Sequence, residues 1–173
     1  MSNKYEEMSD YDYKMIEAYI DKPEVTQWYV NAFKRFNVNG VDIAKWHWSW
    51  WAFFGSFFFL LYRKAYVSAG VLFVLLLVAW FIPFGWLILW ILSGGYATYF
   101  VYKAYKEKRL EVEVQVEDET ERFETMQALG GANEWALVIG VIAQLFFWST
   151  GLFMIGFIFT FLSFIGLAMS NAG

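Results

Sequence analysis

Two long segments of the chain contain no charged residue and no histidine, and they dominate its hydrophobic pattern. They cover residues 65–102 and 135–173. A membrane-spanning helix takes roughly 20 apolar residues, because the core of a bilayer is about 30 Å thick. Each segment is therefore long enough for two crossings. The pattern predicts an all-α membrane protein with two transmembrane helical hairpins.

The first uncharged segment predicts a hairpin whose ends both lie in the cytoplasm. Helices are expected over 65–82 and 86–102, joined by the uncharged turn Pro83–Gly85. Basic residues flank both ends of this hairpin and are missing from its turn. Cytoplasmic loops carry an excess of lysine and arginine, so the turn is expected on the outer side.

The second uncharged segment predicts a broken helix or a second transmembrane hairpin over 135–170. As one straight helix these residues would measure about 54 Å, more than a bilayer core. A break is therefore expected at Ser149-Thr150-Gly151, between helices over 135–148 and 152–170. A half-span or re-entrant course for the first of these helices remains an alternative.

Residues 1–45 are polar and predict a cytoplasmic helical segment. One helix is expected over Tyr11–Ile20, and a second from about Pro23 to about Asn37. Proline suits the first turn of a helix, where its missing N–H is not needed. Asn39-Gly40 then marks a turn.

Residues 46–62 are apolar but short for a crossing, and four tryptophans cluster at one end of them. Tryptophan prefers the membrane interface to the hydrocarbon centre. The segment is thus expected to form one helix lying in or partly dipping into the cytoplasmic leaflet. A full tilted crossing is the competing interpretation.

Residues 103–134 form a charged cytoplasmic connector with two interpretations. Hydrophobic and charged residues alternate over 110–117, which is a strand-like period. A lone strand is weakly stable, so the expected structure is a helix continuing out of the membrane and then a polar helix over 118–129. Gly130-Gly131 is expected to end that second helix.

Composition excludes several classes of function. The chain has no cysteine, which excludes disulfides and cysteine-ligated metals. Its formal net charge of -4 gives no support to nucleic-acid binding. The single histidine, His47, lies between Trp46 and Trp48 with no second ligand at a useful spacing, so it is expected to be an interfacial residue. No nucleophile–base pair, phosphate loop or intramembrane carboxylate pair appears, so neither an enzyme, a cofactor nor a metal is predicted.

Two aromatic stretches resemble a known family. They are Trp28-Tyr29-Val30-Asn31-Ala32-Phe33-Lys34-Arg35-Phe36, and Trp48-Ser49-Trp50-Trp51-Ala52-Phe53-Phe54-Gly55 leading to Tyr62-Arg63-Lys64-Ala65-Tyr66. Over about residues 24–106 the chain is similar to the DUF2628 family of small bacterial membrane proteins. Ser56 stands where that family usually has proline, Trp51 where it has alanine and Ala65 where it has methionine. The resemblance implies a bacterial inner-membrane protein and no active site, because the function of the family is unknown.

Three groups of residues are candidates for interactions. Basic residues near the interface attract anionic lipid headgroups; they are Arg63, Lys64, Lys103, Lys106, Lys108 and Arg109. Tryptophans suited to interface anchoring are Trp46, Trp48, Trp50 and Trp51. Small or hydroxyl side chains that permit close helix association are Gly94, Gly95, Gly156, Thr160, Ser163 and Gly166.

These features predict a non-enzymatic scaffold or accessory subunit of the inner membrane, with both termini cytoplasmic. It is expected to associate with itself, as a homo-oligomer, or with a larger membrane complex. The alternative is a small channel or transporter for an uncoupled solute. A continuous polar path through the helices would favour transport, and a dry bundle with an exposed small-residue face would favour association.

Overall fold

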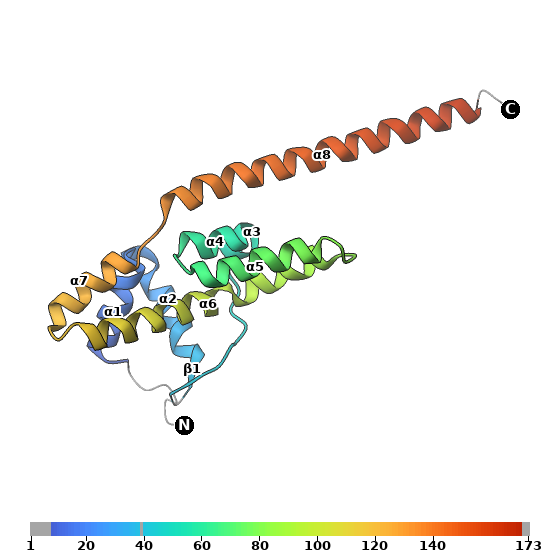
Figure 1. Ribbon diagram of the computed structural model, residues 1–173. Coiled ribbons are helices and arrows are strands. Elements are labelled where there is room, and N and C mark those ends of the chain that lie inside the picture. Colours follow the sequence, from blue (N-terminus) through green and yellow to red (C-terminus); the bar gives the residue numbers. More distant parts are fainter. Residues whose placement is uncertain (1–7, 39, 171–173) are drawn as a thin grey trace. The chain divides into compact units, whose positions relative to one another are not determined.

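The structure, a computed structural model, is mostly helical and describes residues 8–38 and 40–170. Eight helices and one short two-stranded sheet form within these residues (Figure 1). The chain divides into two compact units, Met1–Leu137 and Val138–Gly173. The all-α fold class predicted from the sequence is confirmed.

Two helices open the first unit close to their predicted bounds. Helix α1 covers Asp10–Ile20, and the Ser9 side chain caps it by accepting a hydrogen bond from the backbone of Asp12. The left-handed Asp21 ends it, with φ 47°. Helix α2 covers Pro23–Phe36 and begins with proline at its first turn, as predicted.

A small hairpin follows α2. Strand β1 covers Asn37–Val38 and strand β2 covers Val41–Asp42, paired antiparallel with Val38 opposite Val41. Gly40 lies in the turn with φ 79°, a conformation that favours glycine. The turn predicted at Asn39-Gly40 is therefore present at Gly40, while Asn39 lies outside the described residues.

The single helix expected over 46–62 is wrong, because this segment is divided twice. An extended stretch precedes Ser49, whose hydroxyl caps the short helix α3, Trp50–Gly55. Helix α4, Phe57–Tyr62, follows after Ser56 at φ 48°. The extended stretch donates backbone hydrogen bonds to Gly94 and Gly95, far along the chain, and these bonds compete with helix formation.

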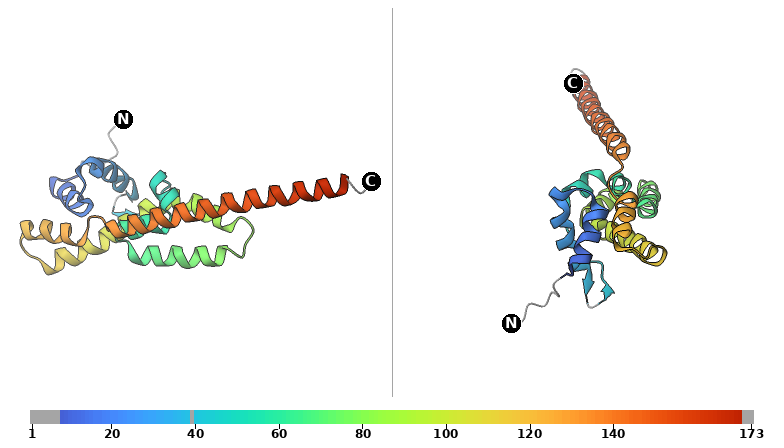
Figure 2. Two further views of the ribbon diagram at one scale, coloured as in Figure 1. Left: turned by 90° about the horizontal axis from the view of Figure 1, so that it is seen from above. Right: turned by 90° about the vertical axis from the view of Figure 1, so that its left-hand side faces the viewer.

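Helices α5, Tyr66–Ala79, and α6, Gly85–Gln115, form the predicted hairpin (Figure 2). The turn begins at Trp80, earlier than expected. Gly85 allows this early turn because a Cβ there would lie only 2.7 Å from the carbonyl oxygen of Ala79. Helix α5 has 14 residues and measures about 21 Å.

The charged connector is helical, as expected. Helix α6 runs on to Gln115, and the Arg109 side chain supports this part by bonding Glu113 one turn later at 2.7 Å. Helix α7, Glu119–Leu129, begins with an Asp118 cap and ends at Gly130. A Cβ on Gly130 would overlap the backbone of Tyr19, so glycine permits the close contact between α7 and α1.

Helices α1, α2 and α7 pack around the second half of α6 and enclose an aromatic core (Figure 2). We call this assembly the head. Phe33 lies between Tyr102 and Tyr105, with ring centroids 5.2 and 5.3 Å away. Other fully buried members of this core are Met15, Ile16, Ile20, Phe36, Val101 and Met126.

Helix α8 covers Glu134–Ser170 without interruption. The break expected at Ser149-Thr150-Gly151, and with it the second hairpin, is therefore wrong. Both hydroxyls bond back to the carbonyl oxygen of Phe146, at 2.8 and 2.9 Å, so neither draws the backbone out of the helix. A glycine inside a helix costs only about 1 kcal/mol, which such a long helix tolerates.

One helical stretch in the described part of the chain is long and apolar enough to cross a membrane, judged by length and composition. It is Glu119–Phe146, and its apolar part is the beginning of α8 because α7 is charged. Helix α5 is apolar but shorter than such a crossing requires.

Candidate functional site: the groove between α5 and α6

A groove of about 560 Å³ runs along the α5–α6 hairpin. Its wall is mostly apolar, and Val71, Leu75 and Leu92 belong to it. The two helices are antiparallel, so the start of α5 lies beside the middle of α6. The groove therefore has one end near Lys64 and Lys108, and it extends from there toward the hairpin turn.

The groove ends in a cluster of basic side chains, which we call the basic end. Lys64, Lys103 and Lys108 line it together with Glu107, a net charge of +2. None of these three lysines forms an ion pair within the described residues. The basic end is therefore a cationic site with a net charge of +2 beside an apolar wall.

Local structure at the end of α4 places Lys64. Its N–H bonds the carbonyl of Leu61, and the next N–H, of Ala65, bonds that of Leu60. This pair of bonds is the Schellman motif, in which one residue takes a left-handed conformation. Lys64 is that residue, with φ 55°.

The C-terminal end of α7 orients two of the lysines. The Lys108 ammonium donates to the carbonyl oxygen of Leu129 at 2.8 Å, and the Lys64 ammonium to that of Ala128 at 3.5 Å. Carbonyls at a helix end lack partners in the helix and carry partial negative charge. Burial, and then the charge of Lys64, lowers the pKa of Lys108. An anion beside Lys108 would therefore stabilise its charged form.

Arg63 was predicted to contact lipid headgroups, but it is buried in the fold with 5% of its surface exposed. Its guanidinium donates to the carbonyl oxygen of Ile20 at 3.2 Å and lies 4.7 Å from the ring centre of Tyr29. The Tyr19 hydroxyl donates to the Arg63 carbonyl oxygen at 3.5 Å. Arg63 thus joins the base of the hairpin to the head.

Two more of the predicted headgroup contacts belong to ion pairs of the head. Lys106 bonds Asp42 at 2.8 Å. Arg109 bonds Asp12 and Glu113, both at 2.7 Å. Burial alone would raise the pKa of Asp42, but hydrogen bonds from Lys106 and Tyr102 outweigh burial and lower it.

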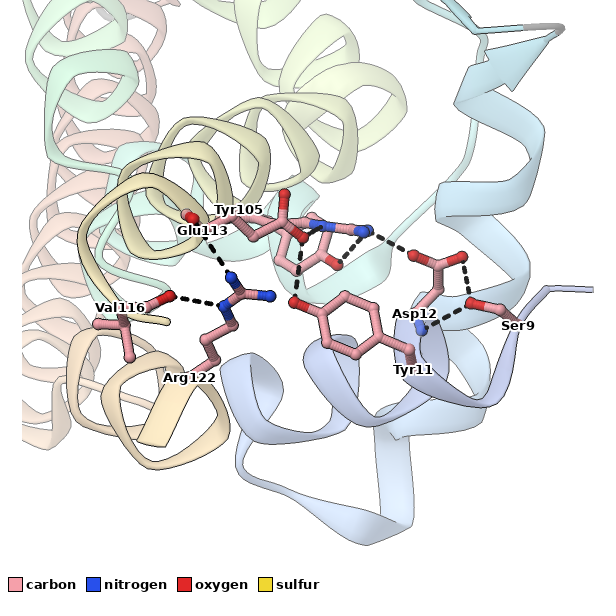
Figure 3. Close-up of polar contacts among 8 residues, drawn as sticks. Ser9, Tyr11, Asp12, Tyr105, Glu113, Val116 and Arg122 are labelled. Atoms are coloured by element: carbon pink, nitrogen blue, oxygen red, sulfur yellow. Dashed lines mark hydrogen bonds and ion pairs between the residues drawn. The ribbon is translucent and has the colours of Figure 1, made fainter. Parts of the chain in front are cut away.

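A polar network surrounds the second of these ion pairs and joins three helices (Figure 3). The Tyr11 hydroxyl of α1 donates to Glu113 of α6 at 3.2 Å. Arg122 of α7 donates to the carbonyl oxygen of Val116 at 2.8 Å. Of the six basic residues predicted to meet headgroups, the structure thus brings only Lys64, Lys103 and Lys108 to the groove.

The small residues Gly94 and Gly95 receive an aromatic segment of the same chain. A Cβ on Gly94 would lie 2.8 Å from the Trp48 ring, and one on Gly95 would overlap the Trp46 ring. The backbone N–H of His47 donates to the Gly95 carbonyl oxygen at 2.9 Å. Association with another helix was predicted at these glycines, but the segment that bonds them is the extended stretch before α3.

The four tryptophans predicted as interface anchors divide into two pairs. Trp46 and Trp48 stack on one another at 6.0 Å and cover the two glycines. Trp50 and Trp51 lie on α3 with 63% and 79% of their surfaces exposed. Trp46 keeps 45% of its surface exposed, so it remains available for anchoring together with the second pair.

His47 lies against aromatic rings, with the Trp28 ring centre 4.6 Å away. Burial, and then the charge of Arg35, lowers its pKa, so the imidazole is neutral at pH 7. Within the described residues, no group of three or more potential ligands could hold a metal ion.

Helix α8 carries the remaining predicted association residues. A Cβ on Gly156 would meet no atom within 4 Å. Thr160 and Ser163 are exposed, and both hydroxyls bond carbonyls of their own helix, at 2.9 and 2.8 Å. Gly166 belongs to α8, but its surroundings lie outside the described part of the structure.

Comparisons of the chain with protein-family models, with curated proteins and with solved structures find no match. The resemblance of residues 24–106 to the DUF2628 family therefore stays a prediction. A function for the chain has to be inferred from the groove, the head and α8 themselves.

Proposed function

We propose that this chain is a non-enzymatic protein of the bacterial inner membrane, acting as a scaffold or accessory subunit. In this proposal the hairpin and α8 lie in the bilayer, and the head lies in the cytoplasm. The chain associates through α8 with a second copy or with a larger complex. The observation that carries the proposal is the separation of apolar and charged surface along the chain.

The apolar surface is concentrated on the hairpin and α8. At the hairpin turn, Trp80, Phe81 and Phe84 have 71%, 87% and 71% of their surfaces exposed. Soluble proteins rarely expose contiguous apolar patches of more than a few hundred Å². In the proposal this turn lies at the outer interface of the bilayer, a depth that suits its tryptophan.

The charged surface belongs to the head, which has its own aromatic core. The Arg109–Asp12 ion pair joins α6 to α1, and the Lys106–Asp42 ion pair joins α6 to strand β2. Basic residues lie on both sides of the hairpin, at Lys64 and at Lys103, which supports a cytoplasmic position for the head. A folded cytoplasmic module joined to a membrane hairpin suits a scaffold.

The topology is testable by cysteine labelling, because the natural chain has no cysteine. Phe81→Cys places a thiol at the exposed hairpin turn, and Glu111→Cys places one on the head. A membrane-impermeant maleimide should label the first in intact spheroplasts and the second only after permeabilisation. Labelling of Glu111→Cys from outside would contradict the proposed orientation, and recovery of the chain in the soluble fraction would contradict the membrane location.

Self-association is testable at Gly156. Helices in lipid associate where small residues allow their backbones to approach closely. Gly156→Cys should therefore form disulfide-linked dimers under mild oxidation in native membranes. Ile158→Cys, about 200° around the same helix, is the matched control and should not. Equal cross-linking at both positions, or none at either, would contradict self-association through Gly156.

A further inference from the structure

We propose that the groove between α5 and α6 binds one anionic phospholipid of the cytoplasmic leaflet. The headgroup phosphate lies at the basic end, against Lys64, Lys103 and Lys108, and one acyl chain lies along the apolar wall. This inference rests on the membrane location proposed above and adds a specific lipid site to it.

Charge complementarity selects an anionic headgroup. The three lysines have no ion-pair partner within the described residues, and the neighbouring Glu107 leaves a net charge of +2. Lys108 uses one donor for the Leu129 carbonyl, and an ammonium has three. The basic end can therefore donate several hydrogen bonds to a phosphate without breaking those that orient it.

The length of the groove selects an acyl chain. Along α5 it runs from Ala65 to Leu75, about 15 Å at 1.5 Å per residue. Half of a bilayer core of about 30 Å has the same depth. A lipid with its headgroup at Lys64 would thus extend its chain toward the hairpin turn, in the direction and over the distance of one leaflet.

The wall of the groove offers few polar groups to an alternative ligand. Its serine on α6, Ser93, already donates to the carbonyl oxygen of Ala52 at 3.1 Å. Val71, Leu72 and Leu75 line the α5 side. A volume of about 560 Å³ falls within the range of small-molecule sites, about 300–1,000 Å³. A free phosphate would satisfy the lysines and leave this apolar wall uncovered.

The test is native mass spectrometry of the full chain in mild detergent, titrated with phosphatidylglycerol or with phosphatidylcholine of the same acyl chains. We expect one retained phosphatidylglycerol per chain and weak retention of phosphatidylcholine. The variant Lys64→Gln/Lys103→Gln/Lys108→Gln should weaken phosphatidylglycerol binding at least about tenfold, because each basic residue contributes to the attraction. The matched control, Lys34→Gln/Arg35→Gln/Lys45→Gln, removes the same charge away from the groove and should bind normally.

A second pair of variants tests the acyl site without changing charge. Val71→Trp fills the wall of the groove, and Leu77→Trp places the same side chain on α5 about 120° around the helix, at an exposed residue that does not line it. Only the first should lose the lipid. The proposal would be overturned if the chain retained both phospholipids equally, or if a groove variant and its matched control lost phosphatidylglycerol to the same extent. Retention of myristate in place of phosphatidylglycerol would also overturn it. A chain that fractionates with membranes and fails these tests refutes the lipid site alone, and a soluble chain refutes the membrane location.

Discussion

Helix α6 places two different kinds of packing on one continuous backbone. Its first half, about residues 85–100, buries small residues, among them Ser93, Gly94 and Ala97, and exposes aliphatic and aromatic side chains. Its second half, which begins at Val101, buries Tyr102, Tyr105 and Val112 and exposes charged side chains.

The difference is the one expected of a helix that passes from lipid into water, as the proposed membrane location requires. Where water surrounds a helix, burying large apolar side chains provides most of the stability. Where lipid surrounds it, that driving force is missing, and close contact through small residues takes its place. The boundary between the two kinds of packing lies near Lys103, where the basic end of the groove begins.

The strongest test of this comparison removes one phenylalanine from each region. Phe33→Ala empties a buried site between Tyr102 and Tyr105 and should destabilise the head by about 4 kcal/mol. Phe81→Ala removes the same side chain from the exposed hairpin turn and should cost under about 0.5 kcal/mol in detergent. Unfolding by heat in mild detergent, followed by circular dichroism, measures both. Similar losses in the two variants would contradict the contrast between large buried side chains and exposed ones.

A second pair of variants tests close contact through small residues. Gly95→Ala should displace the Trp46 ring and cost about 2 kcal/mol. Gly70→Ala lies in the apolar helix α5 with no atom within 4 Å of the added Cβ, and should be neutral or stabilise by up to about 1 kcal/mol. The fluorescence of the tryptophans gives a second readout, because only the first variant moves them. An unchanged spectrum and stability for Gly95→Ala would show that the contact is not needed.

Sequence reasoning locates the helices well where local signals decide. Pro23 and Gly130 mark helix ends through backbone geometry that depends on neighbouring residues. Hydrophobic patterning likewise predicts the hairpin. In the connector the pattern of residues 110–117 is strand-like, and the helix is expected because a lone strand is weakly stable.

The errors have a common cause, which is contact between distant residues. The stretch before Ser49 is extended because it bonds Gly94 and Gly95, more than 40 residues away. The grouping of Lys64 with Lys108 depends on the antiparallel hairpin and on the carbonyls of α7. Nothing in the local pattern at either lysine indicates this, and Arg63 is equally basic yet buried.

The smallest expected effect concerns the ion pairs of the charged half of α6. Asp42 has a lowered pKa in the folded chain, against about 3.9 when unfolded. The ionised Asp42 therefore contributes fully to the free energy of unfolding above the unfolded pKa of about 3.9. This contribution is lost as the pH falls through the lower, folded pKa. Asp42→Asn should cost about 0.5–1 kcal/mol at pH 7.

Urea unfolding in mild detergent at pH 7 and at pH 3 measures this effect, and the difference between Asp42→Asn and wild type should shrink at the lower pH. Glu124→Gln, an exposed carboxylate on α7 without an ion pair in the described residues, is the control and should match wild type. A pH-independent difference for Asp42→Asn would assign the effect to packing in place of charge.

The unbroken course of α8 has a consequence for hydrophobic mismatch. Its 37 residues measure about 55 Å, and even a tilt of 40°, the upper end of the usual range, leaves it about 42 Å tall. A bilayer core of about 30 Å is too thin for such a helix. From Trp135 onward α8 has no charged residue to mark where it leaves the lipid. A spanning α8 would thus favour the thickest membrane regions or thicken the bilayer around it. Variants with α8 shortened by whole turns would accumulate in membrane regions of matching thickness, so their location would report that thickness.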